Sequence, residues 1–286
     1  MGQPSRERLR LGRIEFLNVL PIYYPLESGI ISHPFSIVSG SPAFLNRLMA
    51  EGHLDLSVVS SIEYARHPDR YFLLPDLSIS CHGTVKSVLL FSRVPVDQLG
   101  STTIIATNQS HTSVALLKIL FSRLYGLDVT VRVGSFAEAS AECGLPLAFL
   151  AIGDEALRLS TQRVYPFCMD LGEAWHSWTG LPFVFALWVI QREAAERWNG
   201  ELRAALEILA AAKEWGQTHL DRICAVAAQK GVLSEGELSV YYRCLGFDLN
   251  HDERKGLDFF FRLLEETGEI PSVPELEILS PLACVA

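Results

Sequence analysis

The chain of 286 residues is long enough for one large domain or two modest ones, and its 49% hydrophobic content excludes a disordered protein. A formal net charge of −9 is at odds with the basic surface that nucleic-acid binding needs, so we expect no nucleic-acid partner. No apolar stretch is long enough to span a membrane, and six cysteines without a CxxC pair fit reduced thiols, so we expect a cytoplasmic protein with no membrane partner.

Strand and helix signals alternate from the start of the chain. Arg13–Leu17 is a candidate strand. Ser41–Ala50 has the pattern of a helix, with Ser41 as its N-cap and Pro42 in its first turn. Leu56–Val59 then has the composition of a buried strand.

Two apolar runs, Ser87–Phe91 and Phe183–Ile190, do not alternate with polar residues, which predicts fully buried strands. Between them lie two further strand-helix units: Thr103–Thr107 before Ser113–Tyr125, and Leu147–Ile152 before Asp154–Leu159. A middle segment that could fold by itself predicts a second lobe, residues 90–186, inserted into a first lobe of residues 1–89 and 187–286. The two bracketing strands would form a double-strand hinge.

The last third of the chain is predicted to be helical and to cover the first lobe. A long helical segment runs from Arg192 through Ala228, followed by Glu235–Leu245 and Asp252–Glu266. Asn250 and Glu253 form a capping box at the start of the last helix. Together the elements predict a two-lobed α/β fold, in which each lobe is a mixed, mostly parallel sheet flanked by helices.

Two junctions between a buried strand and a helix contain more hydroxyl groups than one helix cap needs. They are LDLSVVSSIEYA (54–65), with Ser60 and Ser61, and IIATNQSHTSVALLKIL (104–120), with Ser110, Thr112 and Ser113. Free backbone N–H groups, the helix dipole and hydroxyls together make an anion site. Capping alone would explain either junction, but two of them at strand ends predict a cleft for a small ligand with two carboxylates.

Two more polar side chains lie at such positions. His111 could donate to a carboxylate or move a proton, or could be an exposed loop histidine. Asp154 follows a predicted strand, where we expect it to cap the next helix, with a general base as the alternative. The sequence has no GxGxxG, P-loop, HExxH or GxSxG pattern and no metal-ligand spacing around His82, so we expect neither cofactor nor metal.

Six segments, in order along nearly the whole chain, resemble the chorismate dehydratases of the futalosine route to menaquinone. They are GRIEFLNVLPIYYPLE (12–27), DLSVVSSIEYA (55–65), LLPDLSISCHGTVKSVLLFSR (73–93), SHTSVALLKIL (110–120), AIGDEAL (151–157) and DLGEAWHSWTGLPFVFALWV (170–189). The resemblance implies the fold of type II periplasmic binding proteins, here in a cytoplasmic enzyme. The N-x-x-P element of Asn18 to Pro21 and the WTGLPF run are similar to this family and differ from its sibling, dihydroxynaphthoate synthase.

The resemblance also implies a reaction, the loss of water from chorismate to give 3-[(1-carboxyvinyl)oxy]benzoate. It implies these cleft-lining positions: Asn18, Ser60, Ser61, Ser87, Ser110, Thr112 and Ser113. Among them we place Asn18 at the reacting centre and expect the others to bind the substrate, and we add His111 and Asp154 as candidates. Because no strong base is evident beside Asn18, we expect the substrate's own enolpyruvyl carboxylate to take the ring C3 proton. The alternatives are a small-carboxylate solute-binding protein and an enzyme of the dihydroxynaphthoate synthase type. The oligomeric state stays open.

Overall fold

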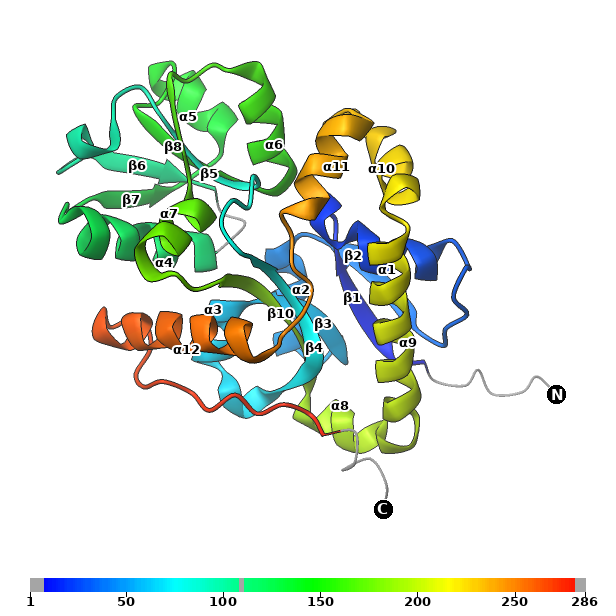
Figure 1. Cartoon of the computed structure of the whole chain (residues 1–286). Helices are drawn as coiled ribbons and strands as arrows, with labels where there is room; N and C mark the ends of the chain where they lie inside the picture. Colours follow the sequence, from blue (N-terminus) through cyan, green and yellow to red (C-terminus); the bar gives the residue numbers. More distant parts are fainter. Residues whose placement is uncertain (1–7, 108–110, 281–286) are drawn as a thin grey trace.

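A computed structural model describes residues 8–107 and 111–280, which form two lobes, each built on a five-stranded sheet (Figure 1). The first sheet has the spatial order β2 (Ser36–Gly40), β1 (Arg10–Ile14), β3 (Leu56–Ser60), β10 (Phe183–Gln191), β4 (Tyr71–Cys81). The second has the order β7 (Thr130–Val133), β6 (Thr103–Ala106), β8 (Ala148–Ile152), β5 (Val88–Ser92), β9 (Phe167–Asp170). The predicted two-lobed α/β class is confirmed.

The two sheets share one topology. β1 is parallel to β2 and β3, and β6 is parallel to β7 and β8. In each sheet one strand runs antiparallel to both of its neighbours: β10 between β3 and β4, and β5 between β8 and β9. Each sheet is therefore mixed, with four strands running in one direction and a single strand reversed. The reversed strand is the first one that the chain forms after it has crossed from the other lobe.

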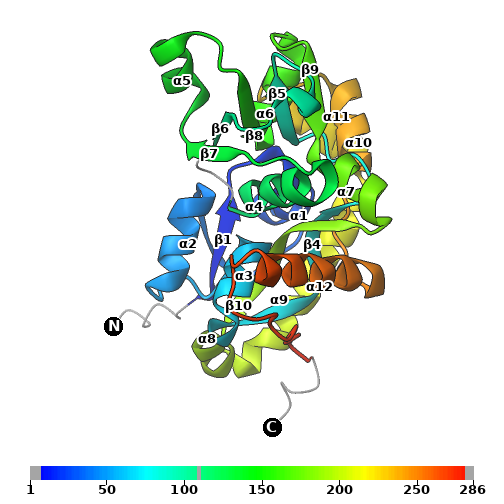
Figure 2. The ribbon, with the colours of Figure 1, turned by 90° about the vertical axis from the view of Figure 1, so that its left-hand side faces the viewer.

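Helices surround both sheets. Before β5 and after β10 they are α1 (Leu20–Glu27), α2 (Pro42–Ala50), α3 (Ser61–Arg66), α8 (Arg192–Arg197), α9 (Asn199–Thr218), α10 (Leu220–Ala228), α11 (Glu235–Arg243) and α12 (His251–Glu266). Between β5 and β10 they are α4 (His111–Ile119) with its continuation η4 (Leu120–Tyr125), α5 (Phe136–Cys143), α6 (Gly153–Gln162) and α7 (Leu171–Thr179). Figure 2 shows α12 close to α4, and α12 packs against α3 and β10 as well as α4, so it contacts both lobes.

Most predicted elements are present, with shifts at their ends. Ser41 caps α2 by accepting a hydrogen bond from Phe44 N at 3.3 Å, as expected. The expected continuous helix over 192–228 is wrong, because Trp198 and His219 leave helical backbone geometry and divide it into α8, α9 and α10. Apolar residues continue across both breaks, so the periodicity of the sequence alone did not show where the helix is interrupted.

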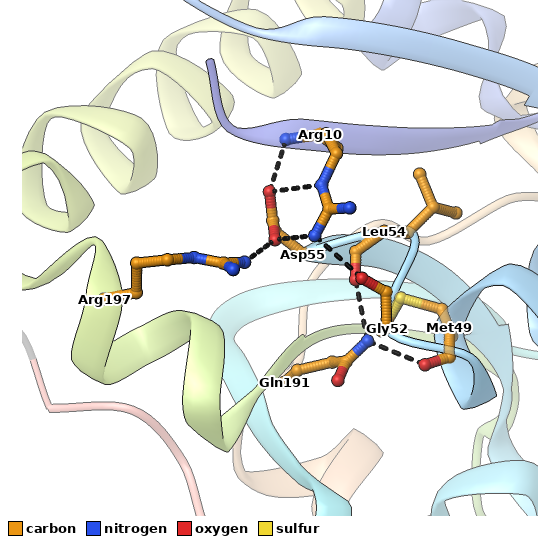
Figure 3. Close-up of polar contacts among 7 residues, drawn as sticks. All are labelled: Arg10, Met49, Gly52, Leu54, Asp55, Gln191 and Arg197. Carbon is orange, nitrogen blue, oxygen red and sulfur yellow. Dashed lines mark hydrogen bonds and ion pairs between the residues drawn. The ribbon is translucent and has the colours of Figure 1, made fainter. Parts of the chain in front are cut away.

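Ion pairs to a buried carboxylate connect the elements at the edge of the first sheet where β1 and β3 begin. Asp55 is 0% exposed, and its carboxylate binds the guanidinium of Arg10 at 2.6 Å and that of Arg197 (Figure 3). Burial raises the pKa of Asp55, but the hydrogen bonds from Arg10 and the charges of both arginines hold it below its usual value. Gln191, at the end of β10, donates to Leu54 O at 2.7 Å. This edge lies opposite the carboxyl ends of β1 and β3.

Two passages of chain, 82–87 and 171–182, connect the lobes and lie directly before β5 and β10. The expected lobe boundaries, between 89 and 90 and between 186 and 187, fall inside these two strands. Every residue of β5 pairs in the second sheet, and β10 pairs only in the first. We therefore propose that the lobes divide within the passages.

The carboxylate of Asp170 joins the two passages. As the N-cap of α7 it accepts hydrogen bonds from Gly172 N at 2.9 Å and Glu173 N at 3.1 Å. It also accepts from Val85 N at 3.0 Å and from Lys86 N at 2.7 Å, in the other passage. One side chain therefore fixes the backbone at both connections between the lobes.

We expect Asp170→Ala to lower the free energy of unfolding by about 2–4 kcal/mol, because it removes a helix cap and leaves buried N–H groups unpaired. Asp170→Asn should cost less, since its amide oxygen can still cap α7. Chemical denaturation measures both, with Asp97→Ala, at an exposed aspartate of the second lobe, as the control. Equal losses for Asp170→Ala and Asp97→Ala would contradict this role.

Candidate functional site

A cavity of about 70 Å³ lies between the lobes, at the carboxyl ends of β1, β3 and β8 and the start of α4. Its polar lining consists of Asn18, Ser60, Ser87 and Ser113. The other lining residues are Ile14, Phe16, Pro42, Ile79, Val85, Val88, Ile152, Gly153, Phe185 and Ala186. None of these described lining residues has an ionisable side chain, so hydroxyls, one amide and backbone dipoles set the electrostatics of the cavity.

The shared topology explains why these residues meet. β1 occupies the same place in the first sheet as β6 in the second, and β3 the same place as β8. The junctions after all four strands contribute to the lining, through Asn18, Ser60, Ser113 and Gly153. Two of these junctions, after β3 and β6, are the anion sites predicted from the sequence, and the structure adds those after β1 and β8.

Two polar atoms of the lining have no hydrogen-bond partner among the described residues. They are Asn18 Oδ1 and Ser60 Oγ, and both are buried. The Ser87 hydroxyl donates to Val85 O at 3.4 Å, a long bond. Because buried polar atoms are normally paired, unpaired ones in a cavity indicate groups that a ligand can satisfy.

The start of α3 is bonded to the opposite lobe. Ile62 N donates to Thr112 Oγ1 at 3.1 Å, and the Ser61 and Thr112 hydroxyls lie 3.3 Å apart. Ser61 and Thr112 are both 0% exposed. The structure thus brings these two predicted site residues together as a contact between the lobes, beside the cavity lining.

Asp154 also reaches across to the other lobe. The prediction that it caps the following helix is not met: its Oδ1 accepts a hydrogen bond from Leu17 N at 3.0 Å, at the start of the turn η1 (Leu17–Val19). Burial raises the pKa of Asp154 above its usual value, against the opposing effects of the Leu17 bond and of nearby cations such as Lys230 and Arg158. No local pattern in the sequence indicates this contact, since the two residues lie 137 positions apart.

The remaining predicted residues lie elsewhere. His111 is exposed at the first residue of α4 and is not part of the described lining, and Ser110 lies outside the described residues. His82 contacts Glu253 Oε1 at 2.8 Å. Within residues 8–107 and 111–280, no group of three His, Cys, Asp or Glu residues is arranged to hold a metal ion. No helix in that part of the chain has the length and apolarity to cross a membrane.

The lobes approach closely at Gly153, which is not among the site residues predicted from the sequence. Its backbone has φ +57°, and a Cβ atom there would lie 3.0 Å from the ring of Phe16 on the other lobe. A larger residue would therefore strain the backbone and press the lobes apart. In the sequence, only its position between a predicted strand and a predicted helix indicates that Gly153 could lie at the cavity.

The cavity is small for a ligand site. Sites for small organic ligands usually enclose roughly 300–1,000 Å³, several times the volume between these lobes. The lobes must therefore move apart to admit a ring-sized ligand, and the two passages at Asp170 are the connections about which such a motion can occur.

Comparison with known proteins gives matches over most of the chain. Residues 9–266 match a family described as menaquinone biosynthesis. A chorismate dehydratase from Thermus thermophilus is 32% identical over 270 residues, 89% of this chain and 94% of that protein. A chorismate dehydratase from Campylobacter jejuni is 32% identical over 180 residues, 61% of this chain and 64% of that protein.

Solved structures show the same fold at low sequence identity. The periplasmic aliphatic sulphonate binding protein of Escherichia coli superposes with a TM-score of 0.67 at 16% identity, covering 96% of this chain and 98% of that one. The alkanesulfonate-binding protein of Xanthomonas axonopodis pv. citri gives a TM-score of 0.68 at 16% identity, covering 98% of each chain. The fold is therefore that of periplasmic binding proteins.

We expect Asp154→Asn to raise the free energy of unfolding at pH 7, by less than about 1 kcal/mol. Because the folded-state pKa of Asp154 is raised, ionisation of this group disfavours the folded state once the pH exceeds that pKa. The gain should shrink as the pH falls through the raised pKa toward the ordinary value of 3.8. Denaturation of wild type, Asp154→Asn and the control Asp97→Asn across this pH range tests it, and a variant less stable than wild type at pH 7 would refute it.

Proposed function

The chain belongs to the menaquinone biosynthesis family, and on that basis we propose that it is a chorismate dehydratase, which removes water from chorismate to give 3-[(1-carboxyvinyl)oxy]benzoate. The observation with most weight is the 32% identity to a chorismate dehydratase over 94% of that protein's length. The biosynthetic family supports a cytoplasmic location for the reaction. The substrate is a small dicarboxylate, as the two hydroxyl-rich junctions predict.

The proposed chemistry begins with loss of the proton at ring C3. That proton is vinylogous to the ring carboxylate, so the electron pair it leaves delocalises through the ring double bond onto this carboxylate. The C4 hydroxyl then leaves as hydroxide, which combines with a proton to form water, and the ring becomes aromatic. Groups that stabilise the ring carboxylate as its negative charge increases therefore lower the barrier.

The cavity supports this chemistry with neutral groups. The hydroxyls of Ser60, Ser87 and Ser113 can donate hydrogen bonds to carboxylates, and helix starts add oriented N–H groups. In a cavity of low polarity such fixed dipoles act more strongly than they would in water. We assign Asn18 to the reacting centre, because its Oδ1 is buried there without a partner.

The surroundings of the cavity support one proposal for the base. The described lining contains no carboxylate and no histidine, the Asp154 carboxylate is bonded to Leu17 N, and His111 is exposed. We therefore propose that the enolpyruvyl carboxylate of chorismate itself takes the C3 proton, while the protein orients the substrate and stabilises charge.

A solute-binding protein for small carboxylates is the alternative that the fold favours, because the sulfonate-binding proteins named above share it. The fold alone does not decide between them, since function depends on the residues of the site. An enzyme of the dihydroxynaphthoate synthase type, acting on a naphthoate precursor, is the second alternative.

We expect purified protein to consume chorismate and form an aromatic product with the mass of 3-[(1-carboxyvinyl)oxy]benzoate, as measured by liquid chromatography and mass spectrometry. Asn18→Ala should lower kcat by roughly 10²–10³-fold, the usual loss when a polar group at the reacting centre is removed. Asn199→Ala, at the start of α9 and outside the cavity lining, is the control. Tight binding of chorismate without turnover would instead indicate a solute-binding protein.

The self-assisted proton transfer predicts that no side chain near the cavity is essential as a base. Asp154→Asn, which cannot accept the proton as a carboxylate does, and His111→Ala should therefore both retain turnover, with kcat within roughly tenfold of wild type. Steady-state kinetics with chorismate measures this. Loss of turnover with intact substrate binding in either variant would assign the base to that residue.

A further inference from the structure

Both backbone polar groups of Leu17 are bonded to side chains from distant parts of the chain. Leu17 N donates to Asp154 Oδ1 at 3.0 Å, and Leu17 O accepts from the Tyr242 hydroxyl at 3.0 Å. Leu17 is 0% exposed and Tyr242 is 2% exposed, so water does not compete for the Tyr242 bond. These two bonds fix the peptide groups on either side of the Leu17 Cα atom.

Leu17 directly precedes Asn18 in η1, the short turn between β1 and α1. The N-cap of this turn is Phe16, whose side chain makes no capping hydrogen bond. Within the turn, Leu20 N donates to Leu17 O, so Tyr242 adds a second hydrogen bond to this oxygen, while Asp154 provides the partner of Leu17 N. Because Tyr242 helps to hold the peptide between Leu17 and Asn18, and Asp154 holds the preceding peptide, both contribute to the direction of the Asn18 side chain.

The two side chains belong to different lobes. Tyr242 lies on α11, which packs against α10, and α10 packs against α1, so this contact is made within one lobe. Asp154 lies in the first turn of α6, directly after β8 of the second sheet. Its bond to Leu17 N exists only while the lobes are in contact, whereas the Tyr242 bond can persist when they separate.

We propose that Tyr242 and Asp154 are positioning residues for Asn18, and that the Asp154 contact makes the geometry of Asn18 complete only when the lobes are closed. The inference rests on the proposed dehydration at this cavity. Closure of the lobes would then be coupled to the reaction, because Asn18 adopts its reactive orientation only after the substrate has been enclosed and water has been excluded.

A positioning role has a kinetic signature. Misorientation of a group at the reacting centre lowers the rate of the chemical step, while substrate binding through the other lining residues is retained. The loss should therefore appear in kcat and leave KM nearly unchanged. A general loss of folding stability would instead lower the amount of active protein without this split.

Tyr242→Phe tests the contact to Leu17 O. We expect kcat for chorismate to fall roughly tenfold with KM within about twofold of wild type, as for loss of one buried hydrogen bond that supports the reacting centre. The control is Tyr64→Phe, because Tyr64 is also buried and its hydroxyl also donates to a backbone carbonyl, Glu275 O at 2.7 Å, away from the cavity lining. The Tyr64 hydroxyl accepts from Glu277 N at 3.0 Å as well, so the control removes at least as much hydrogen bonding as Tyr242→Phe. This variant should have wild-type kcat.

Asp154→Ala and Asp154→Asn test the contact to Leu17 N. The Asn side chain keeps a carbonyl oxygen that can accept the Leu17 bond, so Asp154→Asn should retain most of kcat while Asp154→Ala loses roughly tenfold. A readout independent of activity is hydrogen exchange of the Leu17 amide. It should be fastest in Asp154→Ala and close to wild type in Asp154→Asn.

The outcomes separate this inference from the proposed function. If wild-type protein does not convert chorismate, the proposed function fails, and the inference that depends on it fails too. If wild type converts chorismate but Tyr242→Phe loses no more kcat than Tyr64→Phe, the positioning role of Tyr242 is overturned. If Asp154→Asn is as slow as Asp154→Ala, Asp154 acts through its charge or its proton, and its positioning role is overturned.

Discussion

The first strand that the chain forms after each crossing between the lobes is the single reversed strand of the sheet it enters. This connectivity determines where the cavity can form. Because β10 enters the first sheet and β5 the second, the lobes are joined by two adjacent passages, which the Asp170 carboxylate holds together. The same arrangement directs the carboxyl ends of β1 and β3 toward those of β6 and β8. Four strand-to-helix junctions therefore meet between the lobes, where parallel strands of α/β proteins commonly bind ligands.

The two ends of the first sheet differ in how their polar groups are satisfied. At the edge where β1 and β3 begin, the buried Asp55 is fully engaged by two arginines and a backbone N–H group. At the opposite edge, Asn18 Oδ1 and Ser60 Oγ are buried without partners among the described residues. The ion pairs at the first edge hold the strands in place, while the unpaired oxygens at the second edge remain able to form hydrogen bonds with a ligand. For a protein with a formal charge of −9, such local hydroxyls and N–H groups would hold the proposed dicarboxylate without a basic surface.

Two residues that join the lobes lie next to the groups that we propose for the chemistry of the site. Thr112 and Asp154, both on the second lobe, bind N–H groups at the start of a helix and of a turn on the first lobe. An enzyme with two lobes can enclose its substrate between them, which excludes water and orients groups at the reacting centre. The helices after β10 contribute as well: α11 supplies Tyr242 to Leu17, and α12 contacts both lobes. Besides covering the first lobe, these helices therefore hold the turn before Asn18, through α11, and join the two lobes, through α12.

The sequence by itself determined the class of fold, the helix caps at Ser41 and Asn250, and the hydroxyl-rich junctions, because each depends on residues close together in the chain. Ser60 and Ser113 follow from these junctions, whereas Asn18 and Ser87 come from the resemblance to a known family, and the structure places all four around one cavity. Only the tertiary structure decided the breaks at Trp198 and His219, the position of Gly153 against Phe16, and the partners of Asp154 and Leu17. These features depend on contacts between residues far apart in sequence. Local periodicity and capping patterns contain no information about which distant side chain completes a hydrogen bond.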